Sequence, residues 1–295
     1  MTSLDIDIQT PKKDLEEFNK LTQRILEYIP NVITQRYEKR GYILASSDIA
    51  GRSVLIRPIN MNLFIFDKKE FDKAFGNFEN ILSKIKDKNY LLKASEIGII
   101  DKCTYTIQQS IGIGLDLLVD SNAAKKHIGN RFEELIRAVL NKIEIKNKKI
   151  ILKIPYSENE VYKCETDIVF SSESSVRSND ENIDENEVVV SIKTTSKDRM
   201  AKIFIDKLLM EKFVGHKIKM IGIFLNDVQR KKTDSMSFTF VSNLFIVYNK
   251  FLTTLDGIYF IDIPPHLKNP PFNKYINTFS NFLTKDLKDF LNHES

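Results

Sequence analysis

The chain has 295 residues, of which 42% are hydrophobic, so it can bury a sizeable core and its composition excludes an intrinsically disordered protein. A formal charge of +4 suits a polyanionic ligand but is far from the excess of a histone-like protein. Two cysteines cannot form a disulfide framework, no zinc-binding CxxC or HExxH spacing occurs, and no signal-like or membrane-spanning apolar run is present, so we expect a cytoplasmic protein.

The sequence pattern of the first 118 residues predicts a mostly helical region with some short strands. Apolar residues recur at intervals of three and four over 15–28, which predicts an amphipathic helix, and a further helix is expected over 71–85. The segment 41–66 is rich in β-branched and aromatic residues and predicts short strands. Gly112 and Gly114 lack the third glycine of a dinucleotide fingerprint, so we interpret GIG as a packed bend.

Residues 119–295 alternate strand and helix patterns. A long helix is predicted over 122–143, with Asp120 and Ser121 marking its start, and another helix from about Ser196 to Val214. Strands are predicted in five runs: 150–154, 161–170, 187–193, 218–225 and 257–263. We therefore expect an α/β fold with a mixed central sheet flanked by helices in 119–295, and a mostly helical region in 1–118 that recognises DNA or dimerises.

The segment 171–187 is acidic and polar and has no apolar periodicity. It predicts a mobile, solvated hairpin loop. Because its negative charge would repel DNA, we expect it to lie away from a DNA-binding cleft.

Two charged residues interrupt apolar strand patterns and carry the chemistry of this sequence. Asp167 lies in ETDIVF, and Lys193 follows VVVSI on the next strand, where Val189, Ser191 and Lys193 share one face. Either residue alone is typical of a strand-end charge that reaches solvent. Two such residues on neighbouring strands favour a shared site.

The residue types suit the hydrolysis of a phosphodiester. A carboxylate such as Asp167 can hold Mg²⁺ at a phosphate, because magnesium takes one or two carboxylates with phosphate and water as its other ligands. A lysine beside the cation, here Lys193, can orient or deprotonate the attacking water.

These motifs resemble the core of the PD-(D/E)XK nucleases, in particular type II restriction endonucleases. The upstream helix carries GNRFEEL, Asp167 follows, and then SIK ends at Lys193. Thr166 replaces the proline of the family motif and Ser191 replaces the usual acidic residue. One branch, which recognises CCGG-type and interrupted CC/GG-type sites, has such SxK strands, and KTTSKDR at 193–199 resembles its next motif.

The resemblance implies that the missing carboxylate comes from the following helix, which places it at Asp206. The helix around Asp206 has apolar residues on nearly all sides, so a buried carboxylate there would need a cation or hydrogen-bond donors. An ordinary partnered aspartate is the alternative interpretation. Glu211 is the other candidate, and it ranks second because its spacing from Lys193 fits the branch less well.

Glu133 is the predicted acidic residue of the upstream helix. It lies at the border of the apolar face, whereas Glu134 points almost opposite Phe132 and should be solvated. Without the resemblance, a charged flank of an amphipathic helix would explain Glu133 nearly as well.

Lys197, Asp198 and Arg199 lie at the start of the helix predicted from about Ser196 and are candidate DNA-binding residues. The first turn of a helix can reach base edges in the major groove, where arginine and lysine read guanine and aspartate reads cytosine. In the alternative interpretation Ser196 and Asp198 only cap the helix and leave Lys197 and Arg199 in solvent.

Together these residues predict a Mg²⁺-dependent, site-specific endonuclease for double-stranded DNA. The resemblance implies a homodimer on a palindrome that contains CC/GG, with a DNA methyltransferase as its functional companion. A catalytically degenerate DNA-binding protein on the same fold, or a structure-selective repair nuclease, are the alternatives.

Overall fold

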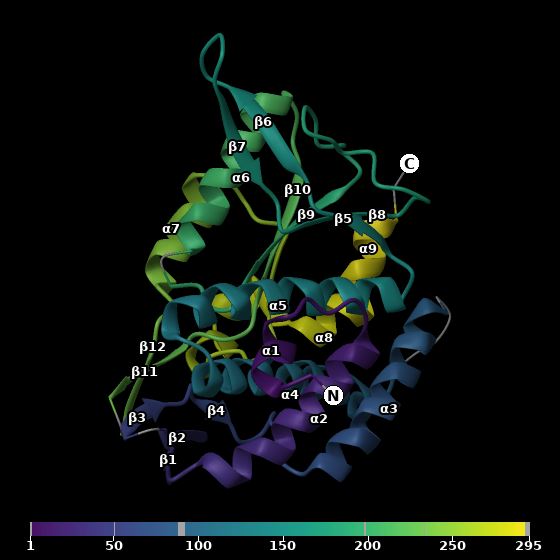
Figure 1. The fold of residues 1–295 in the computed structure, drawn as a ribbon. Coiled ribbons are helices and arrows are strands. Elements are labelled where there is room, and N and C mark those ends of the chain that lie inside the picture. The colour runs from purple at the N-terminus through teal and green to yellow at the C-terminus, as the bar shows by residue number, and fades with distance from the viewer. Residues whose placement is uncertain (1, 50, 88–91, 198, 233, 293–295) are drawn as a thin grey trace.

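The computed structural model describes residues 2–49, 51–87, 92–197, 199–232 and 234–292. Within this part, a six-stranded mixed sheet lies among helices, and a mostly helical N-terminal region packs below it in the view of Figure 1. The predicted fold class is confirmed. No described helix is both long enough and apolar enough to span a bilayer.

The N-terminal region combines helices with a small antiparallel sheet in which β2 pairs with β1, β3 and β4. Its described elements are α1 (Leu4–Gln9), α2 (Leu15–Val32), β1 (Gln35–Lys39), β2 (Tyr42–Ile49), β3 (Arg52–Leu55), β4 (Ile59–Asn60), α3 (Lys68–Lys86) and α4 (Ala94–Leu118). The predicted helices and strands of this region are therefore present, and α2 and α3 each begin after an aspartate whose side chain accepts a backbone N–H of the first turn.

The helix α4 corrects the interpretation of GIG as a bend. Gly112 and Gly114 lie inside this 25-residue helix, most of which is buried on all sides. A Cβ at Gly112 would lie 2.5 Å from the guanidinium carbon of Arg57, and one at Gly114 would lie 2.5 Å from Cδ1 of Ile8. The glycines therefore permit close packing against a regular helix. A helix buried on all sides has no apolar stripe, which is why its periodicity was not predictive.

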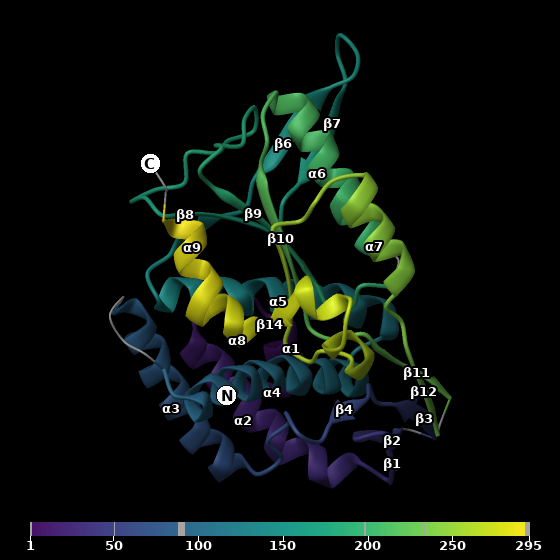
Figure 2. The same ribbon diagram turned by 180° about the vertical axis from the view of Figure 1, so that it is seen from behind.

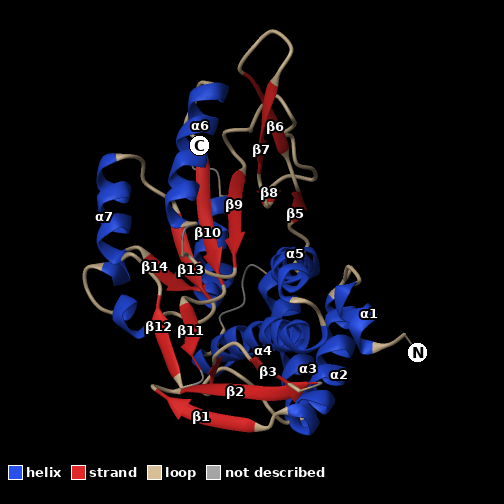
Figure 3. Ribbon diagram, turned by 60° about the vertical axis from the view of Figure 1, so that its left-hand side comes forward, coloured by secondary structure: helices blue, strands red, loops and turns tan. Residues whose placement is uncertain are grey.

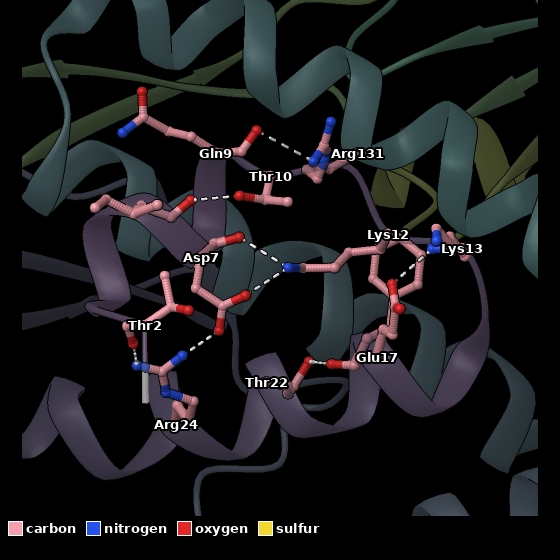
Figure 4. A network of polar contacts seen from close by, with 12 residues as sticks. Thr2, Asp7, Gln9, Thr10, Lys12, Lys13, Glu17, Thr22, Arg24 and Arg131 are labelled. Carbon is pink, nitrogen blue, oxygen red and sulfur yellow. Dashed lines mark hydrogen bonds and ion pairs between the residues drawn. The ribbon is translucent and has the colours of Figure 1, made fainter.

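The N-terminal segment is fastened to α5 (Ser121–Lys142) by polar contacts, part of which Figure 4 shows. Arg131 is 2% exposed and donates to Glu134 at 2.8 Å and to the carbonyl of Gln9 at 3.4 Å. The backbone N–H of Lys12 donates to the second Glu134 oxygen at 2.8 Å. The expectation that Glu134 is solvated was therefore wrong, because the N-terminal segment covers that side of α5.

The main sheet has the strand order β14-β13-β10-β9-β8-β5, with β9, β10, β13 and β14 parallel and β8 and β5 antiparallel to their neighbours. The strands described after α5 are β5 (Lys146–Lys148), β6 (Ile151–Pro155), β7 (Val161–Glu165), β8 (Ile168–Ser171), β9 (Val188–Lys193), β10 (Lys219–Phe224), β11 (Val228–Lys232), β12 (Ser235–Phe238), β13 (Gly257–Phe260) and β14 (Ile276–Thr278). The accompanying helices are α6 (Met200–Val214), α7 (Ser242–Phe251), η1 (Pro265–Lys268), η2 (Phe272–Lys274), α8 (Phe279–Asn281), the π-helix η3 (Phe282–Asp286) and α9 (Leu287–Leu291).

Two predicted elements have different bounds. The strand predicted over 161–170 is divided: β7 forms a hairpin with β6, whereas β8 belongs to the main sheet. Thr166 and Asp167 lie at the division. The helix predicted from Ser196 begins only at Met200, because the amide and hydroxyl of Ser196 donate to Asp227.

The sheet separates two hydrophobic clusters. On one side Val190 and Ile192 pack with buried residues of α2, α4 and α5, and on the other Val189 packs with residues of α6 and α7. Figure 3 shows α6 and α7 on the side of the sheet away from α5, and Figure 2 shows α8 and α9 on the opposite face of the molecule from that of Figure 1. The first cluster includes residues from both sides of position 118, and the domain boundary remains a prediction.

The acidic segment after β8 is more ordered than predicted. Ser178 and Ile183 are fully buried, and the buried Glu187 accepts from the amides of Arg177 at 2.6 Å and Ser178 at 3.0 Å. The expectation of a wholly solvated loop was therefore wrong. Its position agrees with expectation, because it joins the ends of β8 and β9 that are remote from Asp167 and Lys193.

Candidate active site

Asp167 and Lys193 meet at one end of the β8–β9 pair. The Lys193 ammonium donates to Oδ2 of Asp167, and the same oxygen accepts from the backbone N–H of Ile192 at 2.6 Å. The side chains of Lys193 and Asp167 are 22% and 12% exposed. Sequence reasoning therefore named two residues that form a half-buried ion pair with a solvent-accessible edge.

Thr166, which stands where the resemblance expects a proline, makes two hydrogen bonds with Ile150. Its N–H donates to the carbonyl of Ile150 at 2.9 Å, and its hydroxyl oxygen accepts from the N–H of Ile150 at 3.0 Å. A proline would lack the first of these donors. The threonine thus holds the start of β6 beside the turn that carries Asp167.

A pocket of about 300 Å³ unites residues of the strands with residues of α6. Its polar lining includes Asp167 from the turn before β8, Ser191 and Lys193 from β9, and Arg199 and Asp206 from the start and middle of the helix. The pairing of β9 with β10 puts Ser191 on the same face as Lys193, as the alternation of the sequence predicted. Ser191 lies where the resemblance expects an acidic side chain, and Asp206 supplies a carboxylate to the same pocket.

Asp206 is held by a lysine that sequence reasoning missed. The Lys202 ammonium donates to both carboxylate oxygens, at 2.6 and 2.7 Å. The side chain of Asp206 is only 13% exposed, although Ile205 beside it is 57% exposed, so α6 is not buried on all sides as expected. The spacing of four residues between Lys202 and Asp206 was the available signal, because such pairs meet on a helix.

Glu211, the second candidate, lies near the other end of α6. Its carboxylate accepts from the Lys217 ammonium at 3.1 Å and from the backbone N–H of Ile218 at 3.3 Å. These contacts tie the end of the helix to the strand β10. The structure thus brings Asp206, and not Glu211, beside Asp167 and Lys193.

Glu133, on α5, interacts electrostatically with Asp167 and Lys193 but is not among the residues that line their pocket. Its burial and the negative charge of Asp167 raise the pKa of Glu133 to about 7, while the positive charges of Lys193, Lys149 and Arg137 act in the opposite direction. The carboxyl is therefore close to its midpoint of titration at neutral pH, in the field of both central residues. This is the electrostatic environment expected of a group that exchanges protons in a reaction.

The charges of the pocket suit a hard cation shared with a substrate. Among the residues that the structure describes, no three His, Cys, Asp or Glu side chains are placed to hold a metal ion by themselves. Asp167 and Asp206 nevertheless offer two carboxylates to one pocket, and magnesium needs no more than that when phosphate and water complete its coordination. The donor set fits Mg²⁺ bound together with a phosphate.

The predicted DNA-binding residues lie in the loop between β9 and α6. Lys197 is exposed and donates to Oε1 of Gln229 at 3.2 Å, and Arg199 is exposed at the N-cap position of α6 and lines the pocket. Asp198 lies outside the described residues. Ser196 does not cap the helix with its hydroxyl, since that group donates to Asp227 at 2.5 Å.

Comparisons with known proteins agree with this architecture. No protein-family model matches the sequence, and no curated protein matches it. The crystal structure of the type IIP restriction endonuclease Kpn2I is similar over 94% of this chain and 91% of that chain, with a TM-score of 0.72 and 19% sequence identity. A complex of the restriction endonuclease PspGI with substrate DNA covers 76% of this chain and 92% of that chain, with a TM-score of 0.44 and 14% identity. From the first of these similarities, the chain has the fold of a restriction endonuclease.

Proposed function

We propose that this chain, which has a restriction-endonuclease fold, is a site-specific endonuclease that hydrolyses double-stranded DNA with Mg²⁺. The observation that carries the proposal is the pocket in which Asp167, Ser191, Lys193, Asp206 and Arg199 meet. A fold alone does not define an activity, so the proposal depends on this constellation of side chains.

Each group has a role that its position supports. Asp167 and Asp206 would hold the cation, which when bound supplies positive charge to the scissile phosphate. Lys193 can orient the attacking water with one of its protons while Asp167 holds the ammonium in place. Glu133, with a pKa of about 7, can accept a proton from that water at neutral pH.

Recognition would come from the segment next to the catalytic strand. Arg199 can read guanine through O6 and N7 in the major groove, Asp198 can accept from the amino group of cytosine, and Lys197 can reach a second guanine. We therefore propose a palindromic site that contains CC and GG. The N-terminal region would add DNA contacts or a dimer contact.

A homodimer would place one active site on each strand of a palindrome. An exposed apolar stripe on α7 supports this assembly: Leu244, Val247 and Phe251 lie on one face and are 39%, 46% and 72% exposed. We assign that face to a second copy of the chain. Sedimentation equilibrium of the wild type and of Phe251→Glu tests it, with a dimer expected for the wild type and a monomer for the variant.

The function is tested by incubating plasmid DNA with the purified protein and Mg²⁺, and then sequencing the fragment ends. Discrete fragments with one common end sequence support the proposal, and chelation of the metal should abolish them. Binding without cleavage would instead indicate a catalytically degenerate DNA-binding protein. Cleavage only at junctions or flaps would indicate a repair nuclease. A DNA methyltransferase that modifies the same site is the expected companion.

A further inference from the structure

The strands β9 and β10 stay together after the sheet ends. Their parallel pairing reaches Lys193 and Phe224, and then the N–H of Leu225 donates to the carbonyl of Lys193 at 3.1 Å. The N–H of Asn226 donates to the carbonyl of Thr194 at 3.4 Å. The next residue on the β10 side, Asp227, therefore arrives opposite the segment that links Lys193 to α6.

The carboxylate of Asp227 is fully buried and holds this segment. Oδ1 accepts from the amide of Ser196 at 2.7 Å and from the Thr195 hydroxyl at 2.9 Å, and Oδ2 accepts from the Ser196 hydroxyl at 2.5 Å. The hydroxyl of Thr239, which follows β12, adds a bond to Oδ1 at 3.1 Å. A buried carboxylate is costly unless its oxygens are satisfied, and here uncharged donors satisfy them.

We propose that Asp227 is a positioning residue for DNA recognition, which holds the Thr194–Lys197 segment in register with Lys193. The inference rests on the proposed endonuclease function. None of the described hydrogen bonds of the Asp227 carboxylate reaches Lys193 or Arg199, so it acts through Ser196.

The turn around Ser196 carries the effect to Arg199. The carbonyl of Ser196 accepts from the amides of Arg199 at 3.0 Å and Met200 at 2.9 Å, so the position of Ser196 sets where α6 begins. Arg199 lies at that beginning, and Asp206 is less than two turns further along the same helix. One anchor therefore fixes the base-reading arginine, the carboxylate of α6 and the catalytic lysine relative to one another.

The hairpin of β11 and β12 also contacts Asp227 and the segment that it holds. The amide of Thr239 donates to the carbonyl of Asp227 at 2.9 Å, and Gln229 on β11 accepts from Lys197. Arg230 on the same strand donates to the carbonyl of Ile56 at 3.0 Å and to that of Ala45 in the N-terminal sheet. The recognition segment is thus braced against a hairpin that is itself fixed to the N-terminal region.

Asp101 offers a matched control within the same chain. It is a buried carboxylate on α4 that accepts from both the amide and the hydroxyl of one serine, Ser280, with the amide at 2.9 Å. It makes these contacts with α8, and neither residue lines the pocket of Asp167 and Lys193. Asp101→Asn and Asp227→Asn therefore remove the same kind of interaction from two places.

The experiment compares these two variants after the wild-type cleavage site has been mapped. Asp227→Asn replaces the oxygen that accepts from the Ser196 hydroxyl by an amide nitrogen and removes the negative charge that strengthens the other bonds, so the anchor of the segment is weakened. The single-turnover cleavage rate of a cognate duplex with Mg²⁺ should fall by about 100-fold, the cost typical of a misplacement of about 1 Å. Affinity for unrelated DNA should stay within about twofold, because it depends on phosphate contacts.

The ratio of the cleavage rate on the cognate duplex to that on duplexes with one substituted base pair should also fall, by about tenfold. A fall of this size corresponds to the loss of one well-placed base contact. Asp101→Asn should keep both the rate and the preference, although it unfolds at a lower temperature. Ser196→Ala, which retains the amide bond to Asp227, should give a smaller loss in the same direction and serves if Asp227→Asn does not fold.

Equal rates and preferences in the Asp227 and Asp101 variants would overturn the positioning role while leaving the endonuclease function intact. A purely structural role would likewise lower the unfolding temperature without changing the preference. If the wild type cleaves no DNA, the proposed function fails, and the positioning role fails with it.

Discussion

Glu133 on α5 and Asp167 before β8 interact electrostatically across the boundary between helix and sheet. The negative charge of Asp167 adds to the effect of burial and raises the pKa of Glu133 to about 7. The two carboxyl groups therefore differ in character: Asp167 is stabilised by the Lys193 ammonium and the amide of Ile192, whereas Glu133 carries its proton up to neutral pH. The strand carboxylate suits a cation, and the helical carboxyl suits proton exchange.

The first prediction concerns Glu133→Gln and pH. Because the folded-state pKa of Glu133 lies above its ordinary value of 4.5, folding favours the protonated form, and its contribution to stability is fully present below pH 4.5 and lost as the pH rises towards 7. The free energy of unfolding of the wild type should fall relative to Glu133→Gln over that range. Urea unfolding at pH 5 and pH 8 without metal measures it. A constant difference between the proteins would contradict the prediction.

The second prediction separates binding from chemistry. Lys193→Ala should lower the cleavage rate by roughly 100-fold to 1,000-fold or more, the range found when one transition-state donor is lost. DNA affinity should change little, because many phosphate contacts contribute to it. Lys86→Ala on α3, where the lysine pairs with Glu144, is the matched control and should cleave normally. Unchanged cleavage by Lys193→Ala would remove this lysine from the mechanism.

The third prediction compares two acid-to-amide changes on α6. Asp206→Asn removes a carboxylate from the pocket and should lose most cleavage activity or require much more Mg²⁺. Glu211→Gln disturbs only the contacts with Lys217 and Ile218, so it should cleave like the wild type and lose about 1 kcal/mol of stability. Rates measured across a magnesium titration decide between them, and the reverse pattern would assign the metal to Glu211.

The fourth prediction concerns sequence preference. Arg199→Ala should cost roughly 1 to 3 kcal/mol at one base pair of the site, whereas loss of a phosphate contact weakens binding to all sequences alike. Cleavage of the cognate duplex is compared with that of singly substituted duplexes at fixed salt. An equal loss on every duplex, or a mapped site without G·C pairs, would show that Arg199 does not read bases.

The fifth prediction concerns the stability of the N-terminal docking. Glu134→Ala leaves the buried guanidinium of Arg131 without its carboxylate and the amide of Lys12 without an acceptor. Removing one partner of a buried pair costs about 3 to 5 kcal/mol, so chemical denaturation should occur at clearly lower denaturant. The control Glu16→Ala breaks an exposed pair with Lys20 and should cost less than about 1 kcal/mol. A loss of stability in Glu134→Ala as small as that in Glu16→Ala would contradict the prediction.

The sequence predicted the elements whose patterns are local. The helix α5 has one apolar face and a capping aspartate, Asp120, and its bounds were predicted to within about a residue. The helix α4 was missed because residues buried on every side leave no periodic signal. The division of β7 from β8 at Thr166 also has no local signal, since no glycine or proline interrupts 161–170 and the change of partner is decided by β6 and β9.

The candidate site was predictable only where residue type and order coincide. Asp167 and Lys193 stand out because a charge interrupts an apolar strand, and Asp206 was named through a family resemblance. Asp227 follows a strand just as Asp167 precedes one, yet nothing in its neighbours indicates that Ser196, 31 residues away, is its partner. Long-range hydrogen bonds of this kind depend on the parallel strand order, which is a property of the whole fold.

The contacts that close this fold also determine when it can form. Tyr42 donates to the buried Asp262 across 220 positions of sequence at 2.9 Å, and Ser280 satisfies Asp101 across 179 positions. Contacts of such long sequence separation form late and slow folding. During synthesis the partners of Tyr42 and Asp101 are made long after these two residues, so the bonds form only near the end of synthesis. The strand β14, which pairs with β13 at the edge of the sheet, is also made late. We therefore expect a partly synthesised chain to have no cleavage activity, so that activity arises only when the whole core is assembled.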